Sequence, residues 1–400
     1  MKKLTLALLL VLTMCQARFA EASPVVFAES IPLETDYGSS LTARAPQVWV
    51  NMINSASKTL DIGEFYIVSR PGSAMANVVD AIKAAAARGV RVRILIDSVF
   101  YYKMPETPNE LKKVPGVELR IINISKLSGG VMHAKYFIVD GKDLYVGSQN
   151  FDWRSLEQIH ELGVRLSIPE IAANFTDVFN SDWAISQTGA IPAPLPVAKH
   201  PITSANAVTV SYNGGSVAVY PAFSPASFTP GGLDSEIAEL TSYIENARKS
   251  VKIQVMQFKA KGGWRVLFDL LTRVAGRGVK VQLIVADWTM RDSTAARDIK
   301  ELAKVPNISI KVSSIAPYSQ EQIEFARVEH CKYFTVDGEM AFVSTSNWER
   351  AYFYQSRNAA IILKGAAAAA TAEDIFRVSW NSRFAKPVVT EAPVVPSAVK

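Results

Sequence analysis

One pattern of residues occurs twice in this chain, once in each half. It has the form His-x-Lys-x4-Asp-x6-Gly/Ser-Ser/Thr-x-Asn, and the two copies are 197 positions apart. Each copy supplies one imidazole and one ammonium group. A fold that joins the copies could form a phosphate-binding pocket with a nucleophile, a separate acid and no metal ion. The copies consist of His133, Lys135, Asp140, Gly147, Ser148 and Asn150, and of His330, Lys332, Asp337, Ser344, Thr345 and Asn347.

The segments that precede the motif also repeat, and they predict the same β-α-β order in each half. An extended apolar run at 60–68 or 251–258 is followed by an amphipathic helix that ends at a glycine. Each helix leads into a strand with a buried pattern, at 90–96 or 279–285. Strands that alternate with helices are typical of an α/β fold. A repeat on this scale predicts two domains of one kind.

The register of the repeat is fixed from the motif to the last helix of each half. Each copy of the motif lies on a predicted hairpin, in which a strand at 136–139 or 333–336 is followed by an Asp-Gly turn. Because residues two apart on a strand share a face, each motif histidine is expected beside its motif lysine. Three further pairs keep the separation of the motif histidines: Asp177 and Asp374, Phe179 and Phe376, and Trp183 and Trp380.

The beginning of the chain, residues 1–22, is typical of a secretory signal. It has a basic start, an apolar run at 4–14 that is too short to span a membrane, and a small-x-small cleavage pattern at 20–22. We therefore expect a mature chain that starts near Ser23 and is periplasmic or secreted. Cys15 raises lipid attachment as an alternative, against which the bulky residue before it argues.

Composition and charge limit the remaining possibilities. Apolar residues make up 49% of the chain, which excludes wholesale disorder. The net charge of +6 falls to +4 without the signal, which carries three basic and one acidic side chain, and mild basicity suits a phosphate-bearing partner. Cys331 would then be the one cysteine left, so no internal disulfide is expected. We predict domains at 23–189 and 207–386, a proline-rich linker at 190–206 and a disordered tail at 387–400.

The residue types of the motif fit the cleavage of a phosphodiester. Lys135 and Lys332 can neutralise the non-bridging oxygens. One neutral histidine can attack phosphorus while the other, protonated, gives its proton to the leaving oxygen, and water then hydrolyses the phosphohistidine. Further contacts to phosphate are expected from Ser148, Asn150, Thr345 and Asn347, although the hydroxyl of Ser148 can instead cap the helix that follows.

The two histidines need opposite protonation states and therefore unlike surroundings. Glu161 follows His133 by 28 positions on the next strand, where a carboxylate can orient a histidine and favour its charged form. The matching residue of the second half is Asn358, which is neutral. The motif aspartates Asp140 and Asp337 stand in Asp-Gly turns, and we interpret them as a scaffold for the catalytic histidine and lysine.

Other polar residues are interpreted as structural. His160 should face away from Glu161 on an alternating strand, at the surface or behind the site. His200 is expected to be solvated in the linker. Cys331 should point to the core as a packed thiol. Asp97 and Asp287 end equivalent strands, but neither a carboxylate cluster nor a His/Cys spacing supports a metal site.

Aromatic residues flank the elements that should reach the pocket. They are Phe100, Tyr101, Tyr102, Trp288, Tyr352, Phe353 and Tyr354. Such side chains can stack on the bases of a single strand. Packing at the rim or in the core is an equally good interpretation for each of them singly.

These motifs resemble those of the phospholipase D superfamily along the whole mature chain. A closer resemblance, to the branch of vertebrate endolysosomal phospholipase-D-like exonucleases, is carried by 29–32, 147–156, 161–164, 326–328 and 345–348. The resemblance implies two tandem α/β/α sandwich domains related by a pseudo-twofold axis, with the active site at their interface. It also implies a phosphohistidine intermediate and neither a metal ion nor another cofactor. The second copy has Ser344-Thr345 where the superfamily often has Gly-Ser.

The resemblance to that branch implies 5′-to-3′ cleavage of single-stranded DNA or RNA. Relatives that act on phospholipids leave a phospholipase D as the alternative, although no strong amphipathic membrane helix is visible. A non-catalytic envelope binding protein is a second alternative, against which the two intact motifs argue. The roles usual in the superfamily imply that His133 is the nucleophile and His330 the acid. An active monomer is expected because one chain holds both half-sites, and a homodimer stays open.

Overall fold

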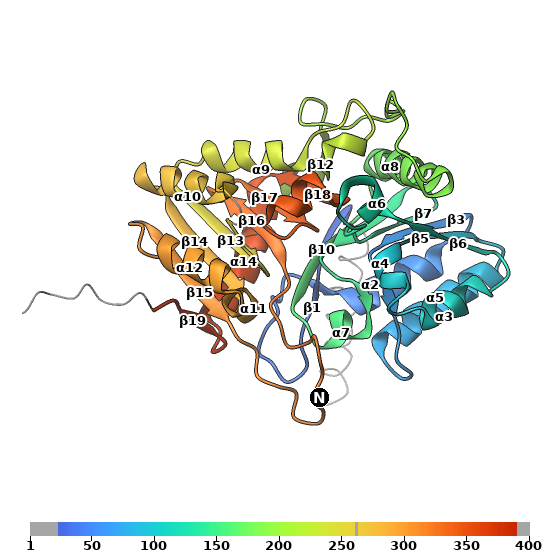
Figure 1. Ribbon diagram of the computed structural model, residues 1–400, viewed down its shortest axis with the longest axis horizontal. Coiled ribbons are helices and arrows are strands. Elements are labelled where there is room, and N and C mark those ends of the chain that lie inside the picture. The colour runs from blue at the N-terminus through green and yellow to red at the C-terminus, as the bar shows by residue number, and fades with distance from the viewer. Residues whose placement is uncertain (1–22, 261–262, 390–400) are drawn as a thin grey trace, which may run out of the picture.

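Two large mixed β-sheets form the framework of the protein (Figure 1). The computed structural model describes residues 23–260 and 263–389; the predicted signal with Cys15 and residues 390–400 of the predicted tail lie outside the described residues. The eight-stranded sheet has the order β2 (Ala43–Arg44), β1 (Val25–Ser30), β10 (Glu161–Leu166), β8 (Asp143–Gly147), β7 (Tyr136–Val139), β3 (Thr59–Glu64), β5 (Arg91–Asp97) and β6 (Val117–Ile122). The nine-stranded sheet has the order β11 (Val208–Tyr212), β12 (Gly215–Ser224), β18 (Asn358–Lys364), β17 (Met340–Ser344), β16 (Lys332–Val336), β13 (Ser250–Val255), β14 (Lys280–Ala286), β15 (Ile308–Ser313) and β19 (Ala385–Pro387).

The two sheets repeat one topology. The order β1-β10-β8-β7-β3-β5-β6 in the first half corresponds to β12-β18-β17-β16-β13-β14-β15 in the second. In both, three strands run parallel, β3-β5-β6 and β13-β14-β15, while the motif hairpins β7-β8 and β16-β17 pair antiparallel. A short separate sheet pairs β4 (Ile67–Val68) with β9 (Phe151–Asp152). The repeat predicted from the sequence is therefore a repeat of one α/β unit.

Helices cover both faces of each sheet and give each half three layers (Figure 1). Along β7 the side chains alternate: Phe137 packs against α2 (Ala45–Ser55) and α3 (Ala74–Ala87), while Tyr136 packs against α8 (Pro169–Thr188). In the second half, α9 (Glu236–Glu245), α10 (Val266–Gly276) and α12 (Ser293–Leu302) cover one face, and α14 (Ala366–Asn381) the other. The short helices are α4 (Ser98–Tyr101), α5 (Glu106–Lys112), α6 (Ile124–Ser128), α7 (Trp153–Glu157), α11 (Asp287–Arg291), α13 (Arg350–Tyr354) and the 3-10 turn η1 (Ala226–Phe228).

One apolar core joins the two halves. It contains buried residues of both sheets together with the buried faces of α8 and α14. The ring of Phe175 on α8 meets the ring of Phe223 on β12 at a centroid distance of 5.0 Å, edge to face. Such aromatic pairs contribute about 1 kcal/mol beyond the area that they bury. Because the core is shared, β8 and β10 of the first sheet lie against β17 and β18 of the second, and the two motifs are held against each other.

The motif aspartates hold the turns of the two hairpins. Asp140 and Asp337 both have a positive φ, 53° and 56°. The carboxylate of Asp140 accepts hydrogen bonds from the backbone of Ser57, Lys58 and Thr59, and Asp337 does the same for residues 248–250. Partial burial acts against ionisation, but these hydrogen bonds lower the pKa of Asp140 to about 2. Both aspartates therefore fix the start of the neighbouring strand, which fits their interpretation as scaffold.

We expect Asp140→Ala to lower the free energy of unfolding by roughly 1–3 kcal/mol, because the charged acceptor of three backbone N–H groups is lost. Since the pKa of Asp140 is lowered by folding, its stabilising effect is present at neutral pH and is lost as the pH falls towards 2. Thermal unfolding at pH 7 and pH 3 measures this. Asp80→Ala on α3, whose side chain is 73% exposed, is the matched control. An Asp140→Ala protein of unchanged stability that has lost its turnover would contradict the scaffold role.

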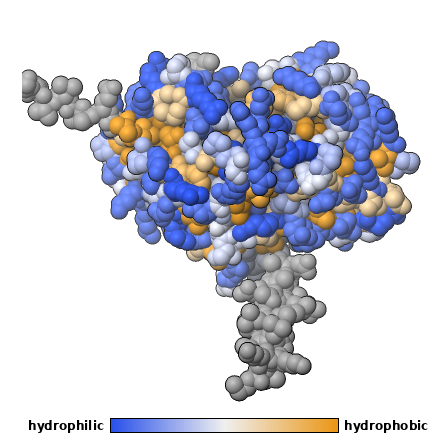
Figure 2. Space-filling model, turned by 90° about the horizontal axis from the view of Figure 1, so that it is seen from below, coloured by the Kyte–Doolittle hydropathy of each residue, from blue (hydrophilic) through white to orange (hydrophobic). Residues whose placement is uncertain are grey.

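The sheet extends further towards the C-terminus than the sequence suggested. Pro387 closes β19, and the backbone N–H of Val388 donates to Ile310, so the segment predicted to be disordered begins inside the fold. β19 pairs with β15, and Val388 packs against the core of the second half. Composition alone does not show these partners. Among the described residues, no helix has the length and apolar character needed to cross a membrane. On the face in Figure 2, hydrophilic residues predominate and apolar residues lie in separate patches.

Candidate active site

A pocket of about 550 Å³ opens where the two halves meet. Its lining includes the motif histidines of both halves, His133 and His330, and both motif asparagines, Asn150 and Asn347. The structure thus brings the two copies of the motif together in one place. Aromatic side chains form much of the wall: Phe65, Tyr66, Phe100, Trp288, Phe325 and Tyr352.

Backbone pairing across the two halves positions the histidines. The backbone N–H groups of His133 and Ala134 both donate to the carbonyl of Arg357, at 2.9 and 2.8 Å. In the corresponding place of the other half, the N–H of His330 donates to the carbonyl of His160 at 2.9 Å. Each motif histidine is therefore fixed by the segment that leads into β18 or β10 of the opposite half.

The side chains of the two histidines are held crosswise. His133 Nδ1 lies 2.9 Å from Asn358 Oδ1, and His330 Nδ1 lies 2.7 Å from Glu161 Oε2. The carboxylate of the first half thus orients the histidine of the second half, and the amide of the second half orients the histidine of the first. The sequence predicted an orienting carboxylate at Glu161 but left open which histidine it serves.

The surroundings of Asn358 fix the tautomer of His133. The amide nitrogen of Asn358 donates to the carbonyl of Tyr352 at 2.8 Å, and its oxygen accepts from the hydroxyl of Thr345 at 2.8 Å. The oxygen is therefore the atom that faces His133, so Nδ1 of that ring carries the proton. This leaves a lone pair on Nε2 of His133, as a nucleophile needs.

The two histidines differ in their readiness to hold a proton. Burial lowers the pKa of His133 well below its usual value of 6.5, and Lys135 and Lys332 lower it further. Burial also lowers the pKa of His330, but the Glu161 carboxylate opposes this. His330 is therefore the histidine that keeps its proton to the higher pH, which fits a division into nucleophile and acid.

The motif lysines approach the pocket from behind the histidines. Each ammonium group donates to the carbonyl of its own motif histidine, Lys135 to His133 and Lys332 to His330 at 2.8 Å. Each lysine is 1% exposed. Burial lowers the pKa of Lys332 to about 8, although Glu161 raises it. Both ammonium groups lower the pKa of His133, so their positive charge acts on that ring.

Of the four residues expected to bind phosphate, two face the pocket. Asn150 and Asn347 line it, and their side-chain oxygens are buried without a hydrogen bond. The expectation for Ser148 and Thr345 does not fit the geometry. Both hydroxyls are buried behind the pocket, where they accept from the backbone N–H of Leu162 and Ala359, at 3.0 and 3.1 Å. The two hydroxyls therefore bind the backbone of the strands that carry Glu161 and Asn358.

Other residues singled out in the sequence have structural positions. Of the two positions expected for His160, the surface is wrong and the place behind the site fits, because the side chain is completely buried between Glu29 and Glu329 of different halves. Cys331 is buried in the shared core, as expected. His200 is exposed and lies 3.2 Å from Asp177. Within the described part of the chain, one group of His, Cys, Asp and Glu side chains has its ligand atoms within 4.8 Å of one another, and it consists of His160, Glu329 and Cys331.

The carboxylates at the strand ends have separate roles. Asp97 accepts hydrogen bonds from the backbone of Val99 and Met132, at 2.8 and 2.7 Å, and so holds the segment just before His133. Asp287 pairs with Arg291 at 3.0 Å. The first role was not visible in the sequence, because it depends on a contact between segments 35 positions apart.

The aromatic residues divide between wall and core. Phe100, Trp288 and Tyr352 line the pocket. Phe353 is instead buried in the apolar core of the second half, and Tyr102 is 76% exposed. Phe65 and Tyr66, which the sequence reading did not single out, also line it, and the ammonium group of Lys135 lies 4.8 Å from the centre of the Phe65 ring. Their place directly after β3 is the signal that could have identified them.

A pair of α/β/α domains with an imidazole–ammonium couple from each at their interface defines a class of phosphodiesterases. A family model described as "Cardiolipin synthase, PLD-like domain" matches residues 49–183 and 240–380. The chain belongs to the phospholipase D superfamily, and it is a phosphodiesterase of that superfamily.

Individual relatives cover nearly the whole chain. It is 26% identical over 387 residues to a probable phospholipase D of Caenorhabditis elegans, which covers 90% of this chain and 69% of the relative. It is 29% identical over 413 residues to the 5′-3′ exonuclease PLD3 of Rattus norvegicus, covering 94% and 83%. The solved structure of a phosphatidylserine synthase from Haemophilus influenzae matches with a TM-score of 0.58 at 14% identity, over 86% of this chain and 85% of that one, and shares its fold.

Proposed function

We propose that this protein is an exonuclease that cleaves single-stranded DNA or RNA in the 5′-to-3′ direction through a phosphohistidine intermediate. The observation that carries the chemistry is the crosswise pair of histidines, one bound to a neutral amide and one to a carboxylate. Two acid–base groups with unlike partners, in one pocket, can take the two roles that a phosphodiester cleavage needs.

The reaction begins with attack of Nε2 of His133 on phosphorus. The bond between phosphorus and the leaving oxygen breaks, and His330 gives its proton to that oxygen. A water molecule then loses a proton to the neutral His330 and attacks the phosphohistidine, which breaks the bond between phosphorus and His133 and releases the phosphomonoester. Lys135 and Lys332 supply the positive charge that the non-bridging oxygens require in both steps.

A second hollow supports a polymeric substrate. A groove of about 770 Å³ adjoins the pocket and shares four of its residues, Met256, Gln257, Trp288 and Phe325. A nucleotide in the pocket can therefore continue into the groove past two aromatic side chains, which can stack on bases. The polarity of cleavage is proposed from the similarity to the rat 5′-3′ exonuclease. Export is proposed from residues 1–22.

A paired substrate assay tests the proposed function. Single-stranded oligonucleotides labelled at either end, and phosphatidylcholine vesicles, are incubated with the protein in the presence of a chelator. We expect stepwise loss of nucleotides from the 5′ end and no release of choline. Release of choline with intact oligonucleotides would assign a phospholipase D instead, and binding of either substrate without turnover would indicate a non-catalytic protein.

The pH dependence of kcat/KM is expected to have its maximum below pH 6.5. The free protein is competent when His133 is neutral and His330 is protonated, and burial lowers both pKa values from 6.5, that of His133 further. The rate falls at lower pH as His133 gains a proton, and at higher pH as His330 loses one. A rate profile from pH 4 to 9 on one oligonucleotide measures this. A maximum above pH 6.5 would contradict the assignment, because the maximum lies between the two histidine pKa values.

A further inference from the structure

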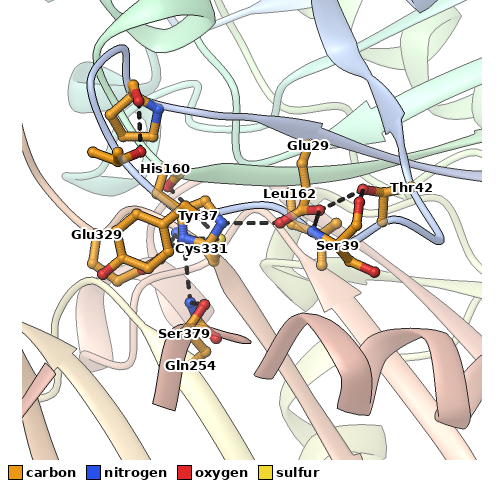
Figure 3. A network of polar contacts seen from close by, with 12 residues as sticks. Glu29, Tyr37, Ser39, Thr42, His160, Leu162, Gln254, Glu329, Cys331 and Ser379 are labelled. Atoms are coloured by element: carbon orange, nitrogen blue, oxygen red, sulfur yellow. Dashed lines mark hydrogen bonds and ion pairs between the residues drawn. The ribbon is translucent and has the colours of Figure 1, made fainter. Parts of the chain in front are cut away.

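A buried imidazole lies between two carboxylates (Figure 3), and the backbone of the same residue, His160, accepts from the N–H of His330. His160 Nδ1 is 2.7 Å from Glu329 Oε2, and His160 Nε2 is 3.1 Å from Glu29 Oε1. All three side chains are at most 1% exposed. Because each ring nitrogen faces a carboxylate oxygen, both must carry a hydrogen, so the ring in this arrangement is an imidazolium.

The groups around His160 balance its charge. The ring of Tyr37 stacks on it at a centroid distance of 4.5 Å, and Cys331 Sγ lies 3.7 Å from Nδ1. The guanidinium group of Arg44 lies 3.9 Å from Glu29. Two carboxylates therefore face one imidazolium and one guanidinium group, and the cluster is neutral with the phenol and the thiol protonated. A metal ion on Glu329 and Cys331 would have to displace the hydrogen on Nδ1.

The counterpart of His160 in the second half is Arg357, at the separation of 197 positions that relates the motifs. Arg357 is also completely buried, and its guanidinium group donates twice to Asp182, both at 2.8 Å. The carbonyl of Arg357 accepts from the backbone of His133, as the carbonyl of His160 accepts from that of His330. Each motif histidine is thus supported by a buried cation of the opposite half.

We propose that His160, as an imidazolium, is a positioning residue that sets His330 against Glu161. Glu329 precedes His330 and Glu161 follows His160, so the ion pair between His160 and Glu329 fastens the two segments that carry the acid and its carboxylate partner. Arg357 takes the corresponding place before Asn358, where a permanent charge anchors it to Asp182 on α8 and its carbonyl accepts from the backbone of His133. The second half-site is therefore the one whose support can titrate. The catalytic consequence rests on the proposed function.

The direction of that titration follows from the neighbours. Burial lowers the pKa of an imidazole, but the carboxylates of Glu329 and Glu29 outweigh it and raise the pKa of His160 well above 6.5. Because the pKa is higher in the folded than in the unfolded protein, the stabilising effect of His160 is complete below pH 6.5 and is lost as the pH rises through its folded-state pKa. Arg357 shows no such loss at these pH values.

Nitrogen NMR of the full chain labelled at histidine tests the proposal without any substrate. The sequence has four histidines, so substitution of each in turn assigns its ring signals. At pH 7 we expect both nitrogens of His160 to be protonated. His160→Gln should shift the ring signals of His330 and leave those of His133 in place, and Asp182→Asn should do the reverse. His200→Gln, at an exposed site, should shift neither.

Three outcomes would overturn the proposal. They are a neutral His160 ring at pH 7, equal shifts of His133 and His330 in both variants, and one equivalent of zinc in the purified protein that is lost in His160→Gln. If His160→Gln does not fold, Glu329→Gln replaces it, since that change keeps the shape and removes one carboxylate, and the same half-specific shift is expected.

The kinetic readout separates positioning from binding. With oligonucleotide substrate, the variant at 160 is expected to lose about 10-fold or more in kcat at nearly unchanged KM, because a misplaced acid slows the chemical step. Loss through KM alone would contradict a positioning role. Absence of turnover in the unmodified protein would refute the proposed function, whereas the NMR result would still decide the place of His160.

Discussion

His133→Ala and His330→Ala are each expected to lower turnover of an oligonucleotide by at least about 10³-fold, with the fold intact. His133 supplies the lone pair for attack, and His330 supplies the proton for the leaving oxygen. The motif asparagines beside them cannot take either role, because an amide neither gains nor loses a proton at these pH values. Initial rates together with thermal unfolding curves measure both the loss and the integrity of the fold.

A substrate with an activated leaving group distinguishes the two histidines. A nitrophenolate leaves without a proton, so a bis(nitrophenyl) phosphate should restore the first step in His330→Ala, seen as a burst of nitrophenolate before the slow hydrolysis of the intermediate. The same substrate should not rescue His133→Ala, because the nucleophile is still missing. Exposed His200 provides the matched control, and His200→Ala should keep full activity on both substrates. Equal rescue of both motif variants would contradict the assignment of His133 as nucleophile and His330 as acid.

Glu161→Gln is expected to have the second largest effect, a loss of roughly 10–100-fold in kcat on substrates with poor leaving groups. The amide keeps the size of the side chain, but the charge that favours protonated His330 is gone. The pKa of His330 then falls further, so the alkaline side of the pH profile should move to lower pH. A pH–rate profile of kcat/KM measures the shift.

The opposite change in the other half is the control. Asn358→Asp places a carboxylate on His133 Nδ1 and should raise the pKa of that ring, so the acid side of the profile moves to higher pH. If Glu161→Gln moved the acid side, or Asn358→Asp the alkaline side, the crosswise pairing would be wrong. A profile that neither variant shifts would mean that other groups limit the rate.

Much of the fold was predictable because the sequence contains it twice. The separation of 197 positions identified matching strands, and the Asp-Gly turns located the motif hairpins and the role of Asp140 and Asp337. Alternation along the strand placed Cys331 in the core. These inferences depend on local periodicity and turn chemistry, which a single sequence records directly.

The contacts between the halves were not predictable in the same way. Nothing in the spacing of Glu161 showed that it would serve His330 of the opposite half, because that contact depends on how two sheets pack. The buried position of His160 has the same origin: its partner Glu329 is 169 positions away. Ser148 resembled a phosphate ligand in the motif, yet the strand backbone beside it takes its hydroxyl.

The covalent intermediate is the most direct test of the central claim. An activated phosphodiester mixed with the His330→Ala protein should form the phosphohistidine while its hydrolysis, which needs that second histidine as base, is slow. The reaction is stopped by rapid denaturation at high pH and not by acid, because the phosphoramidate then stays intact for peptide mapping by mass spectrometry. The account predicts one phosphorylated residue, His133. A phosphate found on another residue, or turnover of the unmodified protein with no phosphorylated residue at any time, would contradict it.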